Sequence, residues 1–170
     1  MIAYASLDTP IGRLLIAKTP RGVCKISLPS ETDGAFFQWI VDRFPEEELI
    51  EDSKDLSDEI LQLQEYFDGD RKRFTFPVDL KTSQFREKAL GKVAQIPFGK
   101  TASYKEIAER INNARAVRAV GSANGSNPIP IVIPCHRVIA HDGTLGGFGG
   151  GLAMKKWLLK HEGYPLPHSD

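Results

Sequence analysis

The chain has 170 residues, of which 41% are hydrophobic and 26% charged, with 15 glycines and 11 prolines. This ordinary globular composition argues against intrinsic disorder, a collagen-like repeat and a coiled coil. No apolar run approaches the roughly 20 residues that span a bilayer, and the N-terminus lacks the basic and apolar segments of a signal peptide. We therefore expect a soluble, cytoplasmic protein without a membrane partner, made of one domain or two small ones.

The formal net charge is zero, but the two halves of the chain differ. Residues 1–77 carry 9 Lys and Arg against 15 Asp and Glu, a net charge of −6, and residues 78–170 carry the compensating +6. This asymmetry is typical of an acidic module joined to a basic one. Charge alone favours an anionic partner for residues 78–170 only slightly, since charges also cluster on solvated faces.

The first part of the chain has the pattern of an antiparallel meander. Three strand-like segments, 2–7, 13–17 and 23–28, are separated by turns that contain Gly and Pro. Cys24 lies in the third segment and is expected to be a small buried hydrophobe.

Two helices are expected to accompany these strands. One covers residues 35–42, and the other covers residues 57–67, where apolar side chains recur at helical spacing. The acidic residues 46–52 are predicted to form a solvated loop and residues 74–78 a short strand. The first module is therefore predicted to be a small α+β domain with an antiparallel sheet and helices, without a catalytic cluster.

From about residue 82 the pattern changes to short helices separated by Gly, Pro and Asn. A helix is predicted at 83–94, a second one begins after Ser103, and a third covers 114–123. Ser103 followed by Glu106 is a capping box, which marks a helix start. Two short helices joined by a tight turn resemble a helix-turn-helix unit, so we expect a mostly helical second domain that contains one.

Cys135 lies in the most informative stretch, residues 127–139, where a proline-flanked apolar run leads into Cys135, His136 and Arg137. The thiolate is the nucleophilic form of cysteine, and basic neighbours can lower the pKa of the thiol. An isolated Cys-His pair is more often structural than catalytic. Whether Cys135 and His136 are catalytic or structural therefore has to be judged from the residues around them.

A glycine-rich loop follows, with six of the 15 glycines in residues 143–151. Such a loop lets the backbone approach a flat ligand and exposes its N–H donors. It lacks the Lys-Ser/Thr ending of a phosphate-binding loop, which argues against a nucleoside triphosphate. The next helix is expected to stop at Gly163 and carries Glu162 near its end.

These motifs together resemble the O6-alkylguanine-DNA alkyltransferases, the methylated-DNA–protein-cysteine methyltransferase family. The resemblance covers residues 81–164 and rests on Pro134-Cys-His-Arg-Val138, on Asn127-Pro before it, and on Gly-Gly-Phe-Gly-Gly-Gly-Leu and His161-Glu-Gly163 after it. It implies a ribonuclease H-like α+β domain over residues 1–77. Residues 78–170 would form the DNA-binding and alkyl-transfer domain.

The reaction implied by the resemblance is direct-reversal DNA repair. Cys135 would irreversibly accept an alkyl group from O6 of guanine, or from O4 of thymine, in a single turnover that needs no cofactor and no metal. His136 would act as base through a water, and Glu162 would orient it. Tyr104 would donate toward N3 of the leaving guanine, and Asn127 would hold the nucleophile segment through backbone hydrogen bonds.

The implied partner is double-stranded DNA that contains O6-alkylguanine, with the damaged base flipped out of the stack. Arg118 would fill the gap while the helix-turn-helix lies in the minor groove. We expect a monomer, with cooperative binding along DNA left open, and association with the nucleoid if the source is prokaryotic. The remaining implied contacts are those of Tyr104, Ala119, Gly121 and Ser122 with DNA, and of Val138, Gly146, Gly147, Phe148 and Gly149 with the substrate.

Phe148 and Gly149 depart from the family pattern, because relatives commonly carry Tyr or Ser in this loop. These two positions therefore offer the substrate no side-chain hydroxyl, whereas contacts with their backbone are still expected. Two other functions compete with alkyl transfer. A non-catalytic lesion-binding protein would lack the nucleophilic cysteine, and a Cys-His hydrolase would leave the helix-turn-helix without a role.

Overall fold

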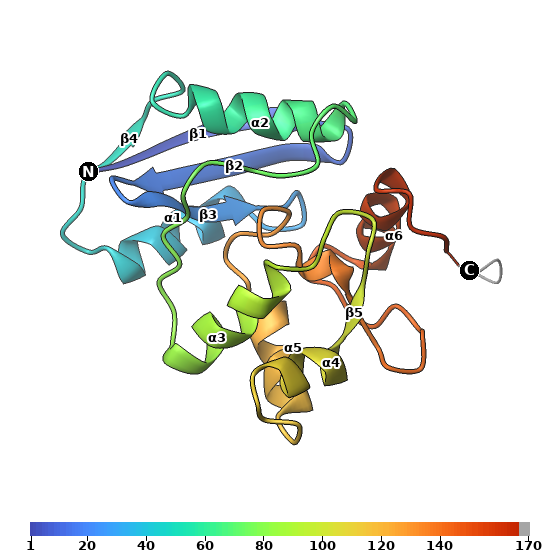
Figure 1. Cartoon of the computed structure of the whole chain (residues 1–170). Coiled ribbons are helices and arrows are strands. Elements are labelled where there is room, and N and C mark those ends of the chain that lie inside the picture. Colours follow the sequence, from blue (N-terminus) through green and yellow to red (C-terminus); the bar gives the residue numbers. More distant parts are fainter. Residues whose placement is uncertain (167–170) are drawn as a thin grey trace. The chain divides into compact units, whose positions relative to one another are not determined.

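The computed structural model describes residues 1–166 and divides the chain into two compact units, residues 1–81 and residues 82–170 (Figure 1). The first unit combines a four-stranded sheet with two helices, and the second consists of short helices and a two-stranded sheet. The predicted α+β class, with a sheet-containing first part and a mostly helical second part, is confirmed. None of the helices among the described residues is long and apolar enough to cross a bilayer.

The sheet of the first unit has the order β3-β2-β1-β4. Strands β1 (Ile2–Thr9), β2 (Gly12–Thr19) and β3 (Gly22–Ser27) form the predicted antiparallel meander. The turn before β3 requires glycine at position 22, because φ is +147° there and a Cβ would lie 2.5 Å from the Pro77 carbonyl oxygen. Turn chemistry that is visible in the sequence therefore sets the register of these strands.

Two local predictions for this unit are wrong. The acidic segment 46–52 contains a strand, β4 (Leu49–Glu51), which pairs in parallel with the start of β1. An edge strand tolerates charged neighbours because one side of it faces solvent. Residues 74–78 do not form a strand: only an isolated bridge joins Val78 to Val23, since the preceding Pro77 has no N–H to extend a ladder.

Helices α1 (Asp33–Arg43) and α2 (Ser57–Phe67) cover the two faces of this sheet (Figure 1). Four consecutive residues of β2, 14–17, are buried, as expected for a strand that is covered on both faces. Cys24 is completely buried in the cluster that includes Phe36 and Ile40 of α1, which confirms its predicted place in the core.

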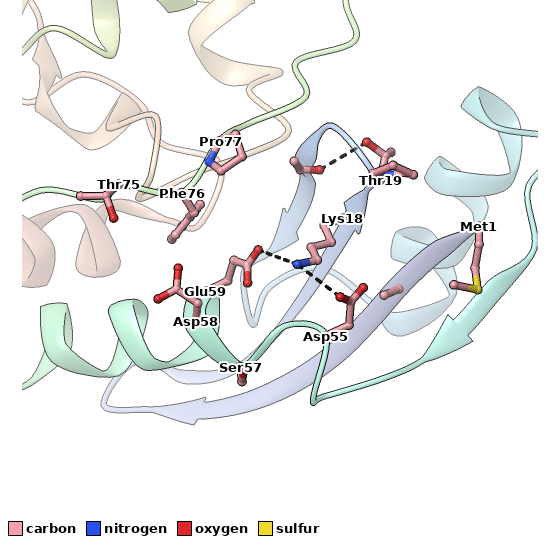
Figure 2. Close-up of a pocket in the computed structure, with 13 residues that line it drawn as sticks. Met1, Lys18, Thr19, Asp55, Ser57, Asp58, Glu59, Thr75, Phe76 and Pro77 are labelled. Atoms are coloured by element: carbon pink, nitrogen blue, oxygen red, sulfur yellow. Dashed lines mark hydrogen bonds and ion pairs between the residues drawn. The ribbon is translucent and has the colours of Figure 1, made fainter.

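A pocket of about 560 Å³ opens on the first unit, between α2, the end of β2 and residues 75–77. Lys18 lies across it, with Nζ 3.0 Å from Glu59 Oε2 and 3.7 Å from Asp55 Oδ1 (Figure 2). The charged groups at its centre are therefore paired with one another.

Up to residue 166, the second unit contains four α-helices and a short parallel pair of strands. The helices are α3 (Gln84–Val93), α4 (Tyr104–Arg110), α5 (Val117–Gly125) and α6 (Leu152–His161). The strands β5 (Ala102–Ser103) and β6 (Val138–Ile139) pair with each other, and the 3-10 turn η1 (Cys135–Arg137) directly precedes β6.

Helices α4 and α5 form the helix-turn-helix. The capping box predicted at Ser103 is present, with Glu106 N donating to Ser103 Oγ at 3.0 Å and Ser103 N donating to Glu106 Oε1 at 3.2 Å. Helix α5 begins at Val117 rather than at the predicted residue 114. The connection takes three more residues because Asn112 adopts a left-handed conformation, with φ of 57°, and a further turn closes between Asn113 and Ala116.

Candidate active site

The loop that precedes Cys135 is held by two hydrogen bonds of the Asn127 side chain. Asn127 accepts from Ile129 N at 3.0 Å and donates from Nδ2 to Ile133 O at 2.8 Å, so it closes the loop before Cys135. Within that loop Ile131 has a φ of +74°, an uncommon conformation for a β-branched residue. Local strain of this kind persists only where the surroundings fix the backbone, and it often accompanies functional sites.

His136, Arg137 and Glu162 form a buried charge network. Glu162, directly after α6, accepts from His136 Nε2 at 2.8 Å and from Arg137 Nε and Nη2 at 2.7 and 2.9 Å. Arg137 Nη1 donates to Ile96 O at 2.7 Å. A bidentate Arg–carboxylate pair has a fixed geometry, so Glu162 is locked in place when it contacts His136.

The protonation states of this network follow from burial and hydrogen bonding. Burial acts to raise the pKa of Glu162, but the hydrogen bonds and charges of His136 and Arg137 outweigh it and hold the pKa far below its usual range. Burial also lowers the pKa of His136, against the opposing effect of Glu162. His136 is therefore neutral near pH 7. Because the carboxylate only accepts, the proton of His136 is on Nε2, which leaves Nδ1 as an acceptor.

Nδ1 of His136 is buried and has no hydrogen-bond partner within residues 1–166. A buried polar atom without a partner carries a desolvation cost of about 1–3 kcal/mol. Cys135, the residue directly before it, is 5% exposed. The site thus combines a buried thiol with a neighbouring imidazole whose free nitrogen can accept a proton.

The pKa of the Cys135 thiol is shifted in the direction opposite to the one expected from the sequence. Basic neighbours were expected to lower the pKa of Cys135, yet burial raises it above the ordinary value, and this effect exceeds the opposing influence of Asn127, of the Lys155 charge and of two backbone amides. Burial dominates because Cys135 is 5% exposed, and neither neighbour offsets it: His136 is neutral and the charge of Arg137 is paired with Glu162. The resting residue is a thiol that must lose its proton during the reaction.

Lys155 ties the glycine-rich loop to β6. Its side chain is fully buried, and Nζ donates to three carbonyls: Val138 O at 2.6 Å, Leu145 O at 2.5 Å and Gly147 O at 3.1 Å. Burial lowers the pKa of Lys155 to about 8, although the Cys135 thiolate would raise it. The charge of Lys155 in turn acts to lower the pKa of the Cys135 thiol.

Tyr104 lies at the start of α4 and packs against the same loop. Its hydroxyl is 3.5 Å from Gly147 O, and a Cβ at Gly146 would lie 3.1 Å from the ring and hydroxyl. Gly146 also has a φ of +72°, so any side chain there would be both strained and crowded. Burial and the neighbouring Cys135 raise the pKa of Tyr104, which keeps the phenol protonated as a donor.

The structure brings most of the predicted site residues together and leaves others at the surface. His136 and Glu162 are hydrogen-bonded beside Cys135, and Cys135 contributes to raising the pKa of Tyr104. Gly149 is exposed and Phe148 is half-buried. On α5, Arg118, Ala119 and Ser122 are exposed, whereas Gly121 is half-buried beside the Tyr104 ring.

Three residues with clear structural roles were missed in the sequence: Arg137, Lys155 and Asn124. Arg137 stands in the Cys-His-Arg triplet, but its partner Glu162 is 25 residues away. Lys155 could have been found, because it shares the apolar face of α6 with Leu158 and Leu159. Asn124 gave no signal. Between residues 1 and 166, no three His, Cys, Asp or Glu side chains gather in a way that could hold a metal ion.

Comparisons with known proteins agree with this geometry. A family model described as "6-O-methylguanine DNA methyltransferase, DNA binding domain" matches residues 84–164, and one described as "6-O-methylguanine DNA methyltransferase, ribonuclease-like domain" matches residues 2–80. The inducible methylated-DNA–protein-cysteine methyltransferase of Bacillus subtilis (strain 168) is 41% identical over 147 residues, covering 86% of this chain and 82% of the relative.

Two mycobacterial relatives extend the match to nearly the whole chain. The methylated-DNA–protein-cysteine methyltransferase of Mycolicibacterium paratuberculosis is 38% identical over 170 residues, covering 99% of this chain and 97% of the relative. The crystal structure of Mycobacterium tuberculosis OGT in complex with DNA has a TM-score of 0.81 at 35% identity, covering 94% and 92% of the two chains. With the Cys-His-Glu cluster in place and both halves of the chain matched, this protein belongs to the 6-O-methylguanine DNA methyltransferase family.

Proposed function

We propose that this protein is a methylated-DNA–protein-cysteine methyltransferase that repairs DNA by direct reversal. Cys135 Sγ attacks the alkyl carbon on O6 of guanine, a C–S bond forms, and the C–O6 bond breaks. The carbon–sulfur bond is a stable thioether, so each molecule acts once. The observation that carries this proposal is the buried Cys135 thiol beside His136, whose Nδ1 is free while Glu162 occupies Nε2.

The proton of the thiol has a defined destination in this proposal. His136 Nδ1 takes it, through a bridging water, while Nε2–H continues to donate to the Glu162 carboxylate. The resulting imidazolium is stabilised by Glu162, which Arg137 keeps ionised and oriented. This division into nucleophile, base and orienting carboxylate follows the general logic of catalytic triads.

The leaving guanine acquires negative charge as the C–O6 bond breaks. Tyr104 donates its hydroxyl proton toward guanine N3, a role that a protonated phenol can fill. Backbone carbonyls of Cys135 and Val138 accept from the amino edge, and the N–H of Gly149 faces O6. Lys155 supports these contacts, because it holds the Val138 carbonyl and the loop carbonyls in one arrangement.

DNA is the macromolecular partner, and the Mycobacterium tuberculosis relative was crystallised in complex with it. The exposed residues Arg118, Ala119 and Ser122 of α5 suit a minor-groove contact, with Arg118 replacing the flipped base in the stack. The charge of +6 over residues 78–170 supports contacts with phosphates. In this proposal residues 78–170 carry DNA binding and alkyl transfer, a ribonuclease H-like domain supports them, and the protein works as a cytoplasmic monomer.

The direct test is the intact mass of the protein after one exposure to duplex DNA that contains O6-methylguanine. A gain of one methyl group, located at Cys135 by peptide mapping, is the expected result. Tight binding without a mass change would instead identify a lesion-binding protein. If the protein neither bound the DNA nor gained a methyl group, the assignment would be wrong.

Base flipping has its own test. Replacing Arg118 by Ala should slow methyl transfer from duplex DNA by about ten- to a hundredfold, because extruding a base costs a few kcal/mol. Transfer from free O6-benzylguanine should be unchanged, since a free base needs no extrusion. Equal losses on the two substrates would show that Arg118 acts on chemistry or folding.

A further inference from the structure

Asn124 is a buried polar residue that the proposed mechanism does not use. It lies in the last turn of α5 and is 6% exposed. Its Nδ2 donates to the carbonyl oxygen of Cys135 at 3.1 Å, whereas its Oδ1 is buried with no hydrogen-bond partner among residues 1–166. Half of this amide is therefore satisfied and half is not.

The orientation of the amide is fixed by its neighbour. A carbonyl oxygen only accepts, so the amide must turn its nitrogen, and not its oxygen, toward Cys135. The Cys135 carbonyl does not depend on this bond alone, because the backbone N–H of Val138 also donates to it. A leucine at position 124 would leave that carbonyl satisfied and would remove the unpartnered Oδ1.

The same amide acts on Tyr104. Gly121 precedes Asn124 by three residues, so the two share a face of α5, and a Cβ at Gly121 would lie 4.0 Å from the Tyr104 ring. The Asn124 side chain acts to lower the pKa of Tyr104, against the larger effect of burial. Only a donor favours the phenolate form, so the part of the amide that acts on the phenol oxygen is its N–H and not the unpartnered Oδ1.

We propose that Asn124 is a positioning residue for alkyl transfer: its amide nitrogen links the Cys135 carbonyl to the Tyr104 oxygen and so directs the hydroxyl proton of Tyr104 to the leaving base. If the Tyr104 oxygen accepts a hydrogen bond from Asn124, its own proton is directed to a different group. In the structure that proton faces Gly147 O at the long distance of 3.5 Å, so it is available to the leaving base. The donor from Asn124 also stabilises the oxygen as it loses its proton. This inference rests on the proposed role of Tyr104 in transfer.

An unpartnered buried oxygen is a poor choice for stability, because replacing such a group by an apolar one of the same shape is often neutral or stabilising. The contrast with Gln62 in the first unit is informative. That buried amide has both ends bonded: Nε2 donates to Asp58 Oδ2 at 3.1 Å and to Thr75 Oγ1 at 2.8 Å, and Oε1 accepts from Thr75 N at 2.9 Å. Gln62 has the pattern of a structural amide and Asn124 does not.

The experiment compares Asn124→Leu with Gln62→Met in single-turnover transfer from free O6-benzylguanine and in thermal melting. Asn124→Leu should slow transfer about tenfold, the effect of one hydrogen bond to a group that gains charge, with an unchanged or higher melting temperature. Gln62→Met should lower the melting temperature and leave the transfer rate unchanged. The opposite pattern would make Asn124 a structural residue.

A double-mutant cycle tests whether Asn124 acts through Tyr104. Tyr104→Phe should slow transfer, and adding Asn124→Leu to it should cost less than twofold more. If the two losses multiply, or if either single variant reacts at the wild-type rate, the inference is wrong. Asn124→Ala provides the same cycle if leucine does not fit. Wild-type transfer to Cys135 in these experiments would leave the proposed function intact, whereas its absence would overturn that function first.

Discussion

The chain contains two buried cysteines, which differ in the groups beside them. Cys24 lies in β3 within an apolar cluster, and its Sγ is 3.6 Å from the Ala17 carbonyl oxygen. Burial raises the pKa of Cys24 to about 12, and the charge of Asp79 adds to the effect. Burial also raises the pKa of Cys135. A lysine charge and a backbone amide oppose burial at both cysteines, Lys25 at Cys24 and Lys155 at Cys135, and Cys135 has in addition the side chain of Asn127 and a second backbone amide.

Burial acts in the same direction on both thiols, so burial does not separate a reactive cysteine from a structural one. A reactive cysteine also needs a base that can remove the proton of the thiol. Cys135 has His136 beside it, and the part of the first unit around Cys24 has no histidine, since residues 1–77 contain none.

Two ion pairs, one from each unit, differ in how far they are buried. In the first unit the Arg13–Asp33 pair is about half exposed on both sides. In the second unit the Arg137–Glu162 pair is almost completely buried. Exposed ion pairs contribute little to stability, whereas the loss of one partner of a buried pair leaves the other charge buried and unpaired, which is destabilising.

The largest expected effect comes from exchanging each cysteine for serine. Cys135→Ser should reduce methyl transfer by more than about a thousandfold, because a hydroxyl is scarcely ionised at neutral pH, while binding of lesion-containing DNA is kept. Cys24→Ser should still transfer one methyl group per molecule, as shown by intact mass. Transfer of one methyl group per molecule to Cys135→Ser would show that Cys135 is not the nucleophile.

The ion pairs can be compared by Glu162→Gln and Asp33→Asn. Removing the buried carboxylate should lower the free energy of unfolding by about 3–5 kcal/mol at pH 7, and the exposed change should cost less than about 1 kcal/mol. Because the pKa of folded Glu162 is depressed, its contribution to stability is complete above the ordinary carboxyl pKa of 4.5 and is lost as the pH falls below that value. In urea titrations the difference between wild type and Glu162→Gln should therefore shrink below that pH. Equal losses for both variants would show that burial does not separate the two pairs.

Lys155→Met tests the buried positive charge that acts on Cys135. The pKa of Lys155 is lowered from 10.5 to about 8, so between these values the unfolded chain binds the extra proton. The stability of the wild type should therefore rise with pH across this window relative to the variant, by up to about 3 kcal/mol. At pH 7 the variant should transfer more slowly, because the loop carbonyls lose their common donor. A pH-independent stability difference would contradict the buried charge.

The smallest effect concerns the alkylated product. Cys135 is 5% exposed, so an added methyl group has to displace neighbours, and overpacking costs about 1–3 kcal/mol. Thermal scans should show a melting temperature about 2–10 °C lower after methylation, and a lower one still after transfer of a benzyl group. An unchanged or higher melting temperature of fully alkylated protein would contradict this picture of the pocket.

Features that depend on neighbours in sequence could be predicted. Gly and Pro placed the turns of the meander, Ser103 and Glu106 marked the start of α4, and helical spacing gave α2. The motif around Cys135, together with the glycine loop and Glu162, indicated the family and a candidate nucleophile, base and carboxylate. The short strand β4 was missed because its pairing partner lies 47 residues away, in β1.

The tertiary structure decided what those groups can do. Whether Cys135 rests as thiol or thiolate depends on burial, and the charge of Arg137 is cancelled by a residue that packing brings from the end of α6. Lys155 and Asn124 gain their roles only when α6 and α5 fold against η1 and the glycine loop. The physical reason is that sequence patterns report local hydrogen bonding and periodicity, whereas pKa values and buried donors are set by solvent exclusion and by contacts between distant segments.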